Sequence, residues 1–143
     1  MMELKKIGVG ELQYLAAYFL QNRNSVENVV ADFGEIEKNN GYGTLFLKPK
    51  NALFKVFWIY SKDNRIMTVG FGGPNLGLSL NELYSVYTNY NEGFNRYDEE
   101  YVYVFYSSKS YKYTVKITSS SKLFEGEQII DDVQINGIEI VLK

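Results

Sequence analysis

The sequence predicts an α+β domain in which antiparallel strands form one sheet, or two short ones, with two to three helices packed on one face. Three observations lead to this fold class. Apolar residues recur at helical spacing between residues 10 and 34 and again from residue 79. Apolar and polar residues alternate between residues 44 and 71 and between 101 and 118. The alternating runs are joined by short turns typical of hairpins, and the length of 143 residues with 45% hydrophobic content fits a single domain over 1–143.

Two helices are expected first. Residues 10–22 form an amphipathic pattern whose apolar members are Leu12, Leu15, Ala16, Phe19 and Leu20. A second helix begins after Ser25, a favourable N-cap, and ends at Gly34. Its apolar stripe consists of Val26, Val29, Val30 and Phe33. A loop is expected around residues 39–41.

Three strands follow that loop. We predict them over residues 44–48, ended by Pro49, over 53–60 and over 66–71. The last two are joined by a turn at residues 61–64, which contains Asp63 and Asn64. The glycine-rich segment 70–77 does not match a phosphate-binding motif, because no Lys-Ser or Lys-Thr pair follows it, and we expect a structural turn there.

A third helix is expected from Ser79 to about residue 91. Ser79 and Glu82 form a capping box, in which each side chain satisfies a free backbone N–H group. Tyr84, Tyr87 and Tyr90 then recur every third residue, which places them on one side of the predicted helix.

Strands are expected again over residues 101–107 and 111–118, and the second shows the clearest one-sided alternation in the chain. The sequence predicts the secondary structure of the C-terminal segment less clearly. Asn136-Gly137 predicts a tight hairpin turn between residues 133–135 and 138–140. Residues 125–132 fit either a strand or a short helical turn, and strand is favoured.

A weak internal repeat links the two halves. The pattern that begins at Ser25 matches the pattern that begins at Ser79, at an offset of 54 residues, and three strand-like runs follow each. This indicates a tandem α-β-β-β duplication with halves 10–72 and 78–143. The alternative is that any capped amphipathic helix shows the same spacing.

The pattern also resembles a known group of folds. It carries the series Ser25, Val29, Val30, Phe33 and Gly34, then a turn at residues 62–64. In this it is similar to the group of BamE and the beta-lactamase inhibitor proteins. The resemblance implies two tandem units and an aromatic-rich concave sheet that grips a partner protein. Members are typically exported, often as lipoproteins. This chain has no cysteine for a lipid anchor, and we expect no signal peptide, so the resemblance does not extend to location and no functional residue is carried over.

The amino-acid composition limits the classes of function that we expect. The chain contains no histidine and no cysteine, but 13 Tyr, 9 Phe and 1 Trp. Most acid–base, thiolate and zinc chemistry depends on the missing side chains, so we expect no enzyme, no cofactor and no metal. A net charge of −2 argues against a nucleic-acid partner, and no apolar run is long enough to span a membrane. The absence of cysteine favours a cytoplasmic location.

Aromatic residues on the predicted strands are the first candidates for binding. We expect a patch formed by Trp58, Tyr60, Tyr101 and Tyr103, because strands that are apolar on both faces need a second cover or leave one face exposed. The alternative is that these rings belong to the core.

Charged residues between the third helix and the strand at 101–107 are the second candidates. Glu92, Asp98, Glu99 and Glu100 would form an acidic rim that steers a basic partner. The alternatives are a solvated loop, a divalent-metal site or a glycosidase acid pair. Arg96 would clamp an anion or pair with the neighbouring acids.

The sequence therefore favours a non-enzymatic module whose partner is another protein. Its sharpest form is an inhibitor or immunity protein that occludes a toxin or enzyme. Two alternatives stay open. One is a small-ligand carrier or carboxylate-based hydrolase with an aromatic-lined pocket, and the other is a structural subunit that forms a homodimer.

Overall fold

The computed structural model describes residues 3–107, 110–126, 128–130 and 135–143. These residues form three helices, an eight-stranded antiparallel sheet and a small separate hairpin, which confirms the α+β class. The helices are α1 (Val9–Gln21), α2 (Val26–Phe33) and α3 (Leu80–Val86). The strands are β1 (Ile36–Asn39), β2 (Thr44–Leu47), β3 (Val56–Lys62), β4 (Arg65–Gly72), β5 (Asn89–Asn95), β6 (Glu100–Ser107), β7 (Ser110–Ser119), β8 (Phe124–Glu125), β9 (Gln128–Ile129) and β10 (Ile135–Leu142).

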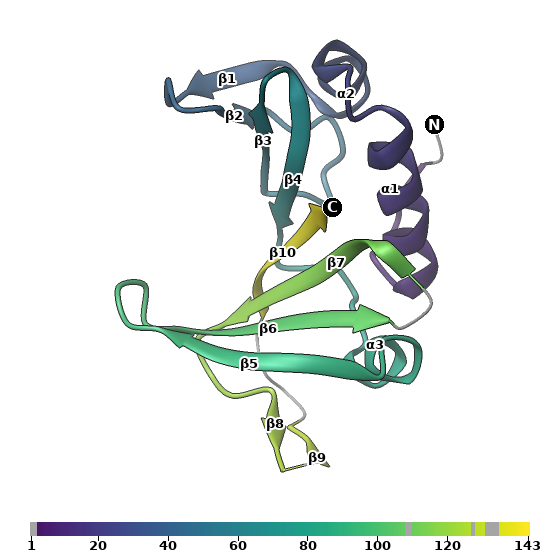
Figure 1. Ribbon diagram of the computed structural model, residues 1–143, viewed down its shortest axis with the longest axis vertical. Coiled ribbons are helices and arrows are strands. Elements are labelled where there is room, and N and C mark those ends of the chain that lie inside the picture. Colours follow the sequence, from purple (N-terminus) through teal and green to yellow (C-terminus); the bar gives the residue numbers. More distant parts are fainter. Residues whose placement is uncertain (1–2, 108–109, 127, 131–134) are drawn as a thin grey trace.

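The sheet order is β1-β2-β3-β4-β10-β7-β6-β5, and β8 pairs only with β9. The strand β10 therefore lies between the two halves of the chain, paired with β4 on one side and β7 on the other. Figure 1 shows the sheet twisting strongly at this point, so that β3 and β4 run nearly at right angles to β5 and β6 in the view. The three helices lie along one side of the twisted sheet.

Capping residues start the short helices where the sequence predicts. The Ser25 hydroxyl accepts a hydrogen bond from the Asn28 N–H at 3.4 Å, and the Ser79 hydroxyl accepts one from the Glu82 N–H at 3.3 Å. Each bond satisfies one of the free N–H groups at a helix start. The turn between β3 and β4 is also as expected, since Asp63 and Asn64 both take the left-handed backbone conformation that two-residue hairpin turns require.

Two aromatic clusters fill the space between the helices and the sheet. The first, under α1 and α2, consists of Tyr18, Phe19, Phe33, Phe54, Phe57 and Phe71. The second, beside α3 and β8, consists of Tyr84, Tyr90, Tyr103, Phe105 and Phe124. Buried aliphatic residues of β4, β7 and β10 join the two clusters into one core. Each half of the sheet thus has its own group of rings, and the central strands connect them.

The predicted third helix is too long. It ends at Val86, and residues 89–95 form the edge strand β5, so Tyr90 does not share a helix with Tyr84 and Tyr87. The Tyr90 ring instead stacks on Phe124, with ring centroids 4.4 Å apart. Asn89 and Asn91 are also poor helix formers, which removes the local preference for continuing the helix.

Three other boundaries differ from the prediction. The strand β1 was not expected, because all four of its residues are exposed and no apolar alternation marks it. The strand β3 begins at Val56, three residues after the predicted start. The expected turn at Asn136-Gly137 is instead an irregularity within β10, where the pairing with β7 shifts register. Residues 131–134 lie outside the described residues, and strand rather than helix is seen at residues 128–129.

The two halves follow the same order. After α2 come β1 to β4, and after α3 come β5, β6, β7 and, beyond the small hairpin of β8 and β9, β10. Four strands of the eight-stranded sheet thus follow each helix, rather than the expected three. In the sheet these sets face each other, with β1 and β5 at the edges and β4 and β10 at the centre. A duplicated unit of one helix and four strands would produce this order.

Replacing the buried Ile140 of β10 by alanine should destabilise the protein strongly. Ile140 is 0% exposed and lies opposite both Val69 and Val115, so the change leaves a cavity where the halves meet. We expect the free energy of unfolding, measured by urea denaturation, to fall by about 3 kcal/mol. Val141→Ala on the opposite face is the control and should lower it by about 1 kcal/mol or less. Equal losses would contradict a core that is continuous through β10.

Candidate functional site

The register of the sheet separates two faces. Residues directly opposite one another share a face, so Phe57, Phe71 and Ile138 lie together on the side covered by the helices. Their chain neighbours Trp58, Gly70 and Glu139 point to the other side, which we call the open face.

The four aromatic residues expected to form one patch are divided between these faces. Trp58 and Tyr60 lie on the open face, whereas Tyr101 and Tyr103 lie on the helix-covered face. Tyr103 is 0% exposed, and its hydroxyl accepts a hydrogen bond from the Leu123 N–H at 3.0 Å. The single patch predicted from the sequence is therefore wrong. The pairing of β6 with β7, which places Tyr103 opposite Ile117, decides the face.

Trp58 and Tyr60 belong to a smaller aromatic surface, the open-face platform, made of Phe46, Val56, Trp58 and Tyr60. Phe46 lies opposite Trp58, and the Trp58 ring covers Gly70 on the next strand. A Cβ atom at Gly70 would come within 2.1 Å of the indole Cε2 atom. Gly70 is therefore the residue that lets the ring lie flat on the sheet, and the platform has a fixed shape.

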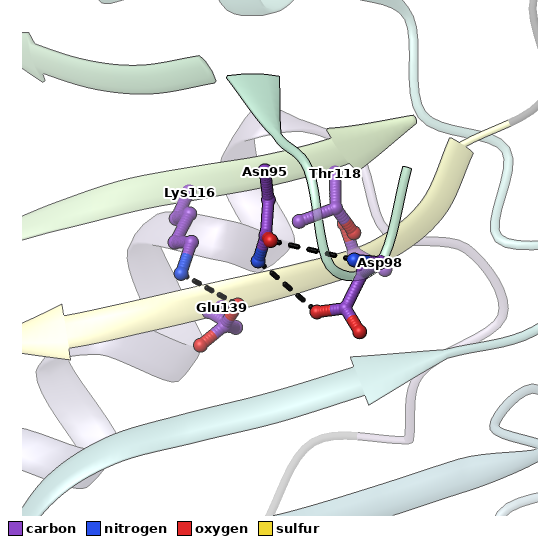
Figure 2. Close-up of polar contacts among 6 residues, drawn as sticks. Asn95, Asp98, Lys116, Thr118 and Glu139 are labelled. Carbon is purple, nitrogen blue, oxygen red and sulfur yellow. Dashed lines mark hydrogen bonds and ion pairs between the residues drawn. The ribbon is translucent and has the colours of Figure 1, made fainter. Parts of the chain in front are cut away.

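An ion pair continues the platform across the open face. The Lys116 Nζ atom lies 3.4 Å from the Glu139 carboxylate, and Glu139 is directly opposite Gly70. Figure 2 shows the pair in front of β7 and β10, with α1 behind the sheet. The open face thus presents aromatic rings beside one paired positive and negative charge.

The turn between β5 and β6 is the second exposed feature. In Figure 1 it extends beyond the rest of the sheet, and we call residues 94–101 the hairpin tip. The Asn95 side chain holds the turn, because its oxygen accepts hydrogen bonds from the N–H groups of Tyr97 at 3.0 Å and Asp98 at 3.3 Å. Its amide also donates to the Asp98 carboxylate at 3.1 Å, as Figure 2 shows. Such side-chain bonds to the backbone fix the turn locally.

The hairpin tip exposes two rings that the sequence-based patch omitted. Tyr97 is 99% exposed and Phe94 is 53% exposed. Phe94 contacts Tyr101, with ring centroids 5.0 Å apart. A signal was present in the sequence, because an aromatic residue among turn formers such as Asn95 and Asp98 is seldom needed for folding.

Only some of the charged residues predicted to form one acidic rim lie close together in the structure. Arg96, Asp98 and Glu99 are exposed at the hairpin tip, where Glu99 takes a left-handed backbone conformation. Glu100 accepts a hydrogen bond from the Asn136 amide at 2.6 Å.

Glu92 lies apart from these acids. It sits opposite Tyr103 on the helix-covered side and 3.9 Å from the Lys122 ammonium. Among the described residues, Arg96 forms no ion pair with the acids, and no group of acids is arranged to hold a metal ion.

Two core tyrosines have altered acidity. Burial raises the pKa of Tyr87, and the hydrogen bond between its hydroxyl and that of Tyr113, at 2.7 Å, raises it further. Burial is also the main cause that raises the pKa of Tyr103, and the nearby Glu92 carboxylate adds to it. Both rings are therefore held in the neutral form, which suits structural residues.

Gly70→Ala should displace the tryptophan. Trp58 is the only tryptophan in the chain, so its fluorescence reports on the platform alone. We expect its emission to move to longer wavelength and the free energy of unfolding to fall by about 1–3 kcal/mol, because the added methyl group overlaps the ring. Gly93→Ala is the matched control, since no atom lies within 4 Å of the added Cβ there. Unchanged emission in Gly70→Ala would show that the ring does not rest on Gly70.

Alkaline pH should destabilise the fold through Tyr87 and Tyr103. Their folded pKa values lie above the ordinary value of about 10. Above that pH the unfolded chain releases protons that the folded chain keeps, so stability is complete below it and falls as pH rises. The free energy of unfolding should fall by up to about 1.4 kcal/mol per pH unit for each tyrosine. Urea denaturation at several pH values measures the slope, which Tyr87→Phe should reduce and Tyr42→Phe, at an 87% exposed ring, should not.

Comparison with known proteins does not assign the chain to a family. No family model, curated protein or solved structure matches the chain. The resemblance to the BamE and beta-lactamase-inhibitor group stays an expectation. No helix in the described part of the chain is long and apolar enough to cross a membrane.

Proposed function

We propose that this chain is a non-enzymatic protein-binding module and that the hairpin tip is its main contact. The observation that carries the proposal is the position of Tyr97. Its ring is 99% exposed at the end of a projecting hairpin, on a turn held by Asn95.

Exposure and order together favour binding. A ring that is 99% exposed buries no area in the folded chain, so Tyr97 adds almost nothing to folding stability. The hydrogen bonds of Asn95 restrict the turn before any partner arrives, which reduces the entropy lost on association. Tyrosine is also among the residues that dominate binding energy at protein interfaces.

Charge at the hairpin tip favours a basic partner. Asp98, Glu99 and Glu100 follow Tyr97 directly in the chain, and Arg96, the opposing charge, precedes it. Exposed charges of this kind change the rate of association more than the final affinity, and salt screens them. The association rate should therefore fall as ionic strength rises.

The absence of histidine and cysteine from the sequence supports a binding role over catalysis. The specific form that we propose is an inhibitor or immunity protein that blocks a toxin or enzyme. The open-face platform would supply a second contact in such a complex, with the flat Trp58 ring as its centre.

Tyr97→Ala should weaken partner binding without changing the fold. The wild-type chain, immobilised, is used to capture and identify the partner from the native host, and affinity is then measured by calorimetry with the purified partner. We expect a loss of about tenfold to a hundredfold, the range of an aromatic anchor at an interface. Tyr42→Ala is the matched control, because Tyr42 is 87% exposed at the turn between β1 and β2.

Equal affinities for Tyr97→Ala and wild type would contradict the proposed contact. Light scattering on the isolated chain distinguishes this function from self-association. A homodimer that Tyr97→Ala leaves intact, with no captured partner, would replace the proposal with a structural role.

A further inference from the structure

A hollow of about 420 Å³ lies between residues 3–4, the end of α2 and the connection from β2 to β3. Its size is within the range of small-molecule sites. The residues that matter for its chemistry are Leu4, Phe33 and Phe54, which form an apolar floor, and Glu3, Asp32 and Lys50, which form a charged rim. The hollow belongs to different elements from the hairpin tip and is independent of the proposed function.

The apolar floor is part of the rigid core. Phe33 stacks on Phe57 with ring centroids 4.8 Å apart, and Phe54 contacts Phe57 and Phe71 at 5.2 Å each. Leu4, Phe33 and Phe54 are each 5% exposed or less. A ligand would therefore meet apolar side chains whose positions are already fixed by packing.

Hydrogen bonds hold the walls. The Asn51 amide donates to the Leu4 carbonyl at 2.9 Å, and the Asn51 oxygen accepts from the Leu53 N–H at 2.9 Å. The Lys50 N–H donates to the Phe33 carbonyl at 2.8 Å. The N-terminal segment and the connection from β2 to β3 are thus tied to each other and to α2, so the hollow exists before any ligand binds.

The rim carries unbalanced negative charge. Asp32 accepts a hydrogen bond from the Tyr18 hydroxyl, and the Lys50 ammonium donates to the Ala31 carbonyl rather than to a carboxylate. Within the part of the chain that the structure describes, neither Glu3 nor Asp32 forms an ion pair. Two carboxylates beside an apolar floor, opposed by one ammonium that is already hydrogen-bonded, favour a cation.

We propose that this hollow binds a small organic amine: an apolar ring or chain on Leu4, Phe33 and Phe54, with its protonated amine at the carboxylates of Asp32 and Glu3. The amine would complete the charge balance of the rim. The apolar body would contact the small part of the floor that is exposed, and the rings of Phe33 and Phe54 would also attract a nearby cation.

Two probes of similar size and opposite charge test the proposal. Phenethylamine and phenylpropionate both carry a phenyl ring on a short chain, one ending in an ammonium and the other in a carboxylate. Each is titrated into the full chain while amide chemical shifts are followed by NMR. We expect phenethylamine to shift the amides of Phe33, Lys50 and Phe54 in a saturable way, and to bind about fivefold or more tightly than phenylpropionate.

Variants of the two rim carboxylates test whether they bind the amine. Asp32→Asn keeps an acceptor for the Tyr18 hydroxyl but removes the charge, and should weaken phenethylamine binding about three- to fivefold, with Glu3→Gln as a second variant. Asp63→Asn, at the exposed turn between β3 and β4, is the control and should bind as the wild type does. Equal binding of the two probes, no saturable shift at the hollow, or wild-type affinity in both rim variants would overturn the proposal.

Discussion

The central strand β10 is the constraint on which the rest of the structure depends. It joins the two halves of the sheet, because it pairs with Val69 and Gly70 of β4 on one side and with Val115 and Lys116 of β7 on the other. Without it, each half would be a short sheet with one helix-covered face, too small to bury its rings well. With it, the aromatic cluster under α1 and α2 and the cluster beside α3 belong to one core.

This arrangement gives the aromatic residues three separate roles. Most rings, such as Phe57 and Tyr103, stabilise the core beneath the helices. Trp58 lies over Gly70 on the open face, where the glycine leaves room for the indole. Tyr97 extends from the hairpin tip and packs on nothing. A high aromatic content therefore does not by itself indicate a binding surface, and the sheet register and turn geometry decide which rings reach a partner.

Features set by neighbouring residues were predictable from the sequence. The caps at Ser25 and Ser79 and the turn at Asp63 and Asn64 depend on a few consecutive residues, and all are as expected. Features set by distant pairing were not. Tyr90 fits a helical repeat with Tyr84, but stacking on Phe124 places it in a strand. The faces of Tyr101 and Tyr103 follow from the register with β7, which alternation within β6 cannot give. The expected patch therefore keeps Trp58 and Tyr60 on one face and loses Tyr101 and Tyr103 to the other, and its role in binding stays a prediction.

The two outer strands of the sheet leave it unequally protected against unwanted association. The edge at β1 has four residues, among them the charged Glu37 and Lys38, and short charged edges discourage a further strand from joining. The edge at β5 has seven residues and a single charged side chain, Glu92. The β5 edge therefore offers a much longer row of free backbone donors and acceptors to a strand from another molecule. Strand addition, as in domain swapping or fibril growth, is expected mainly at β5.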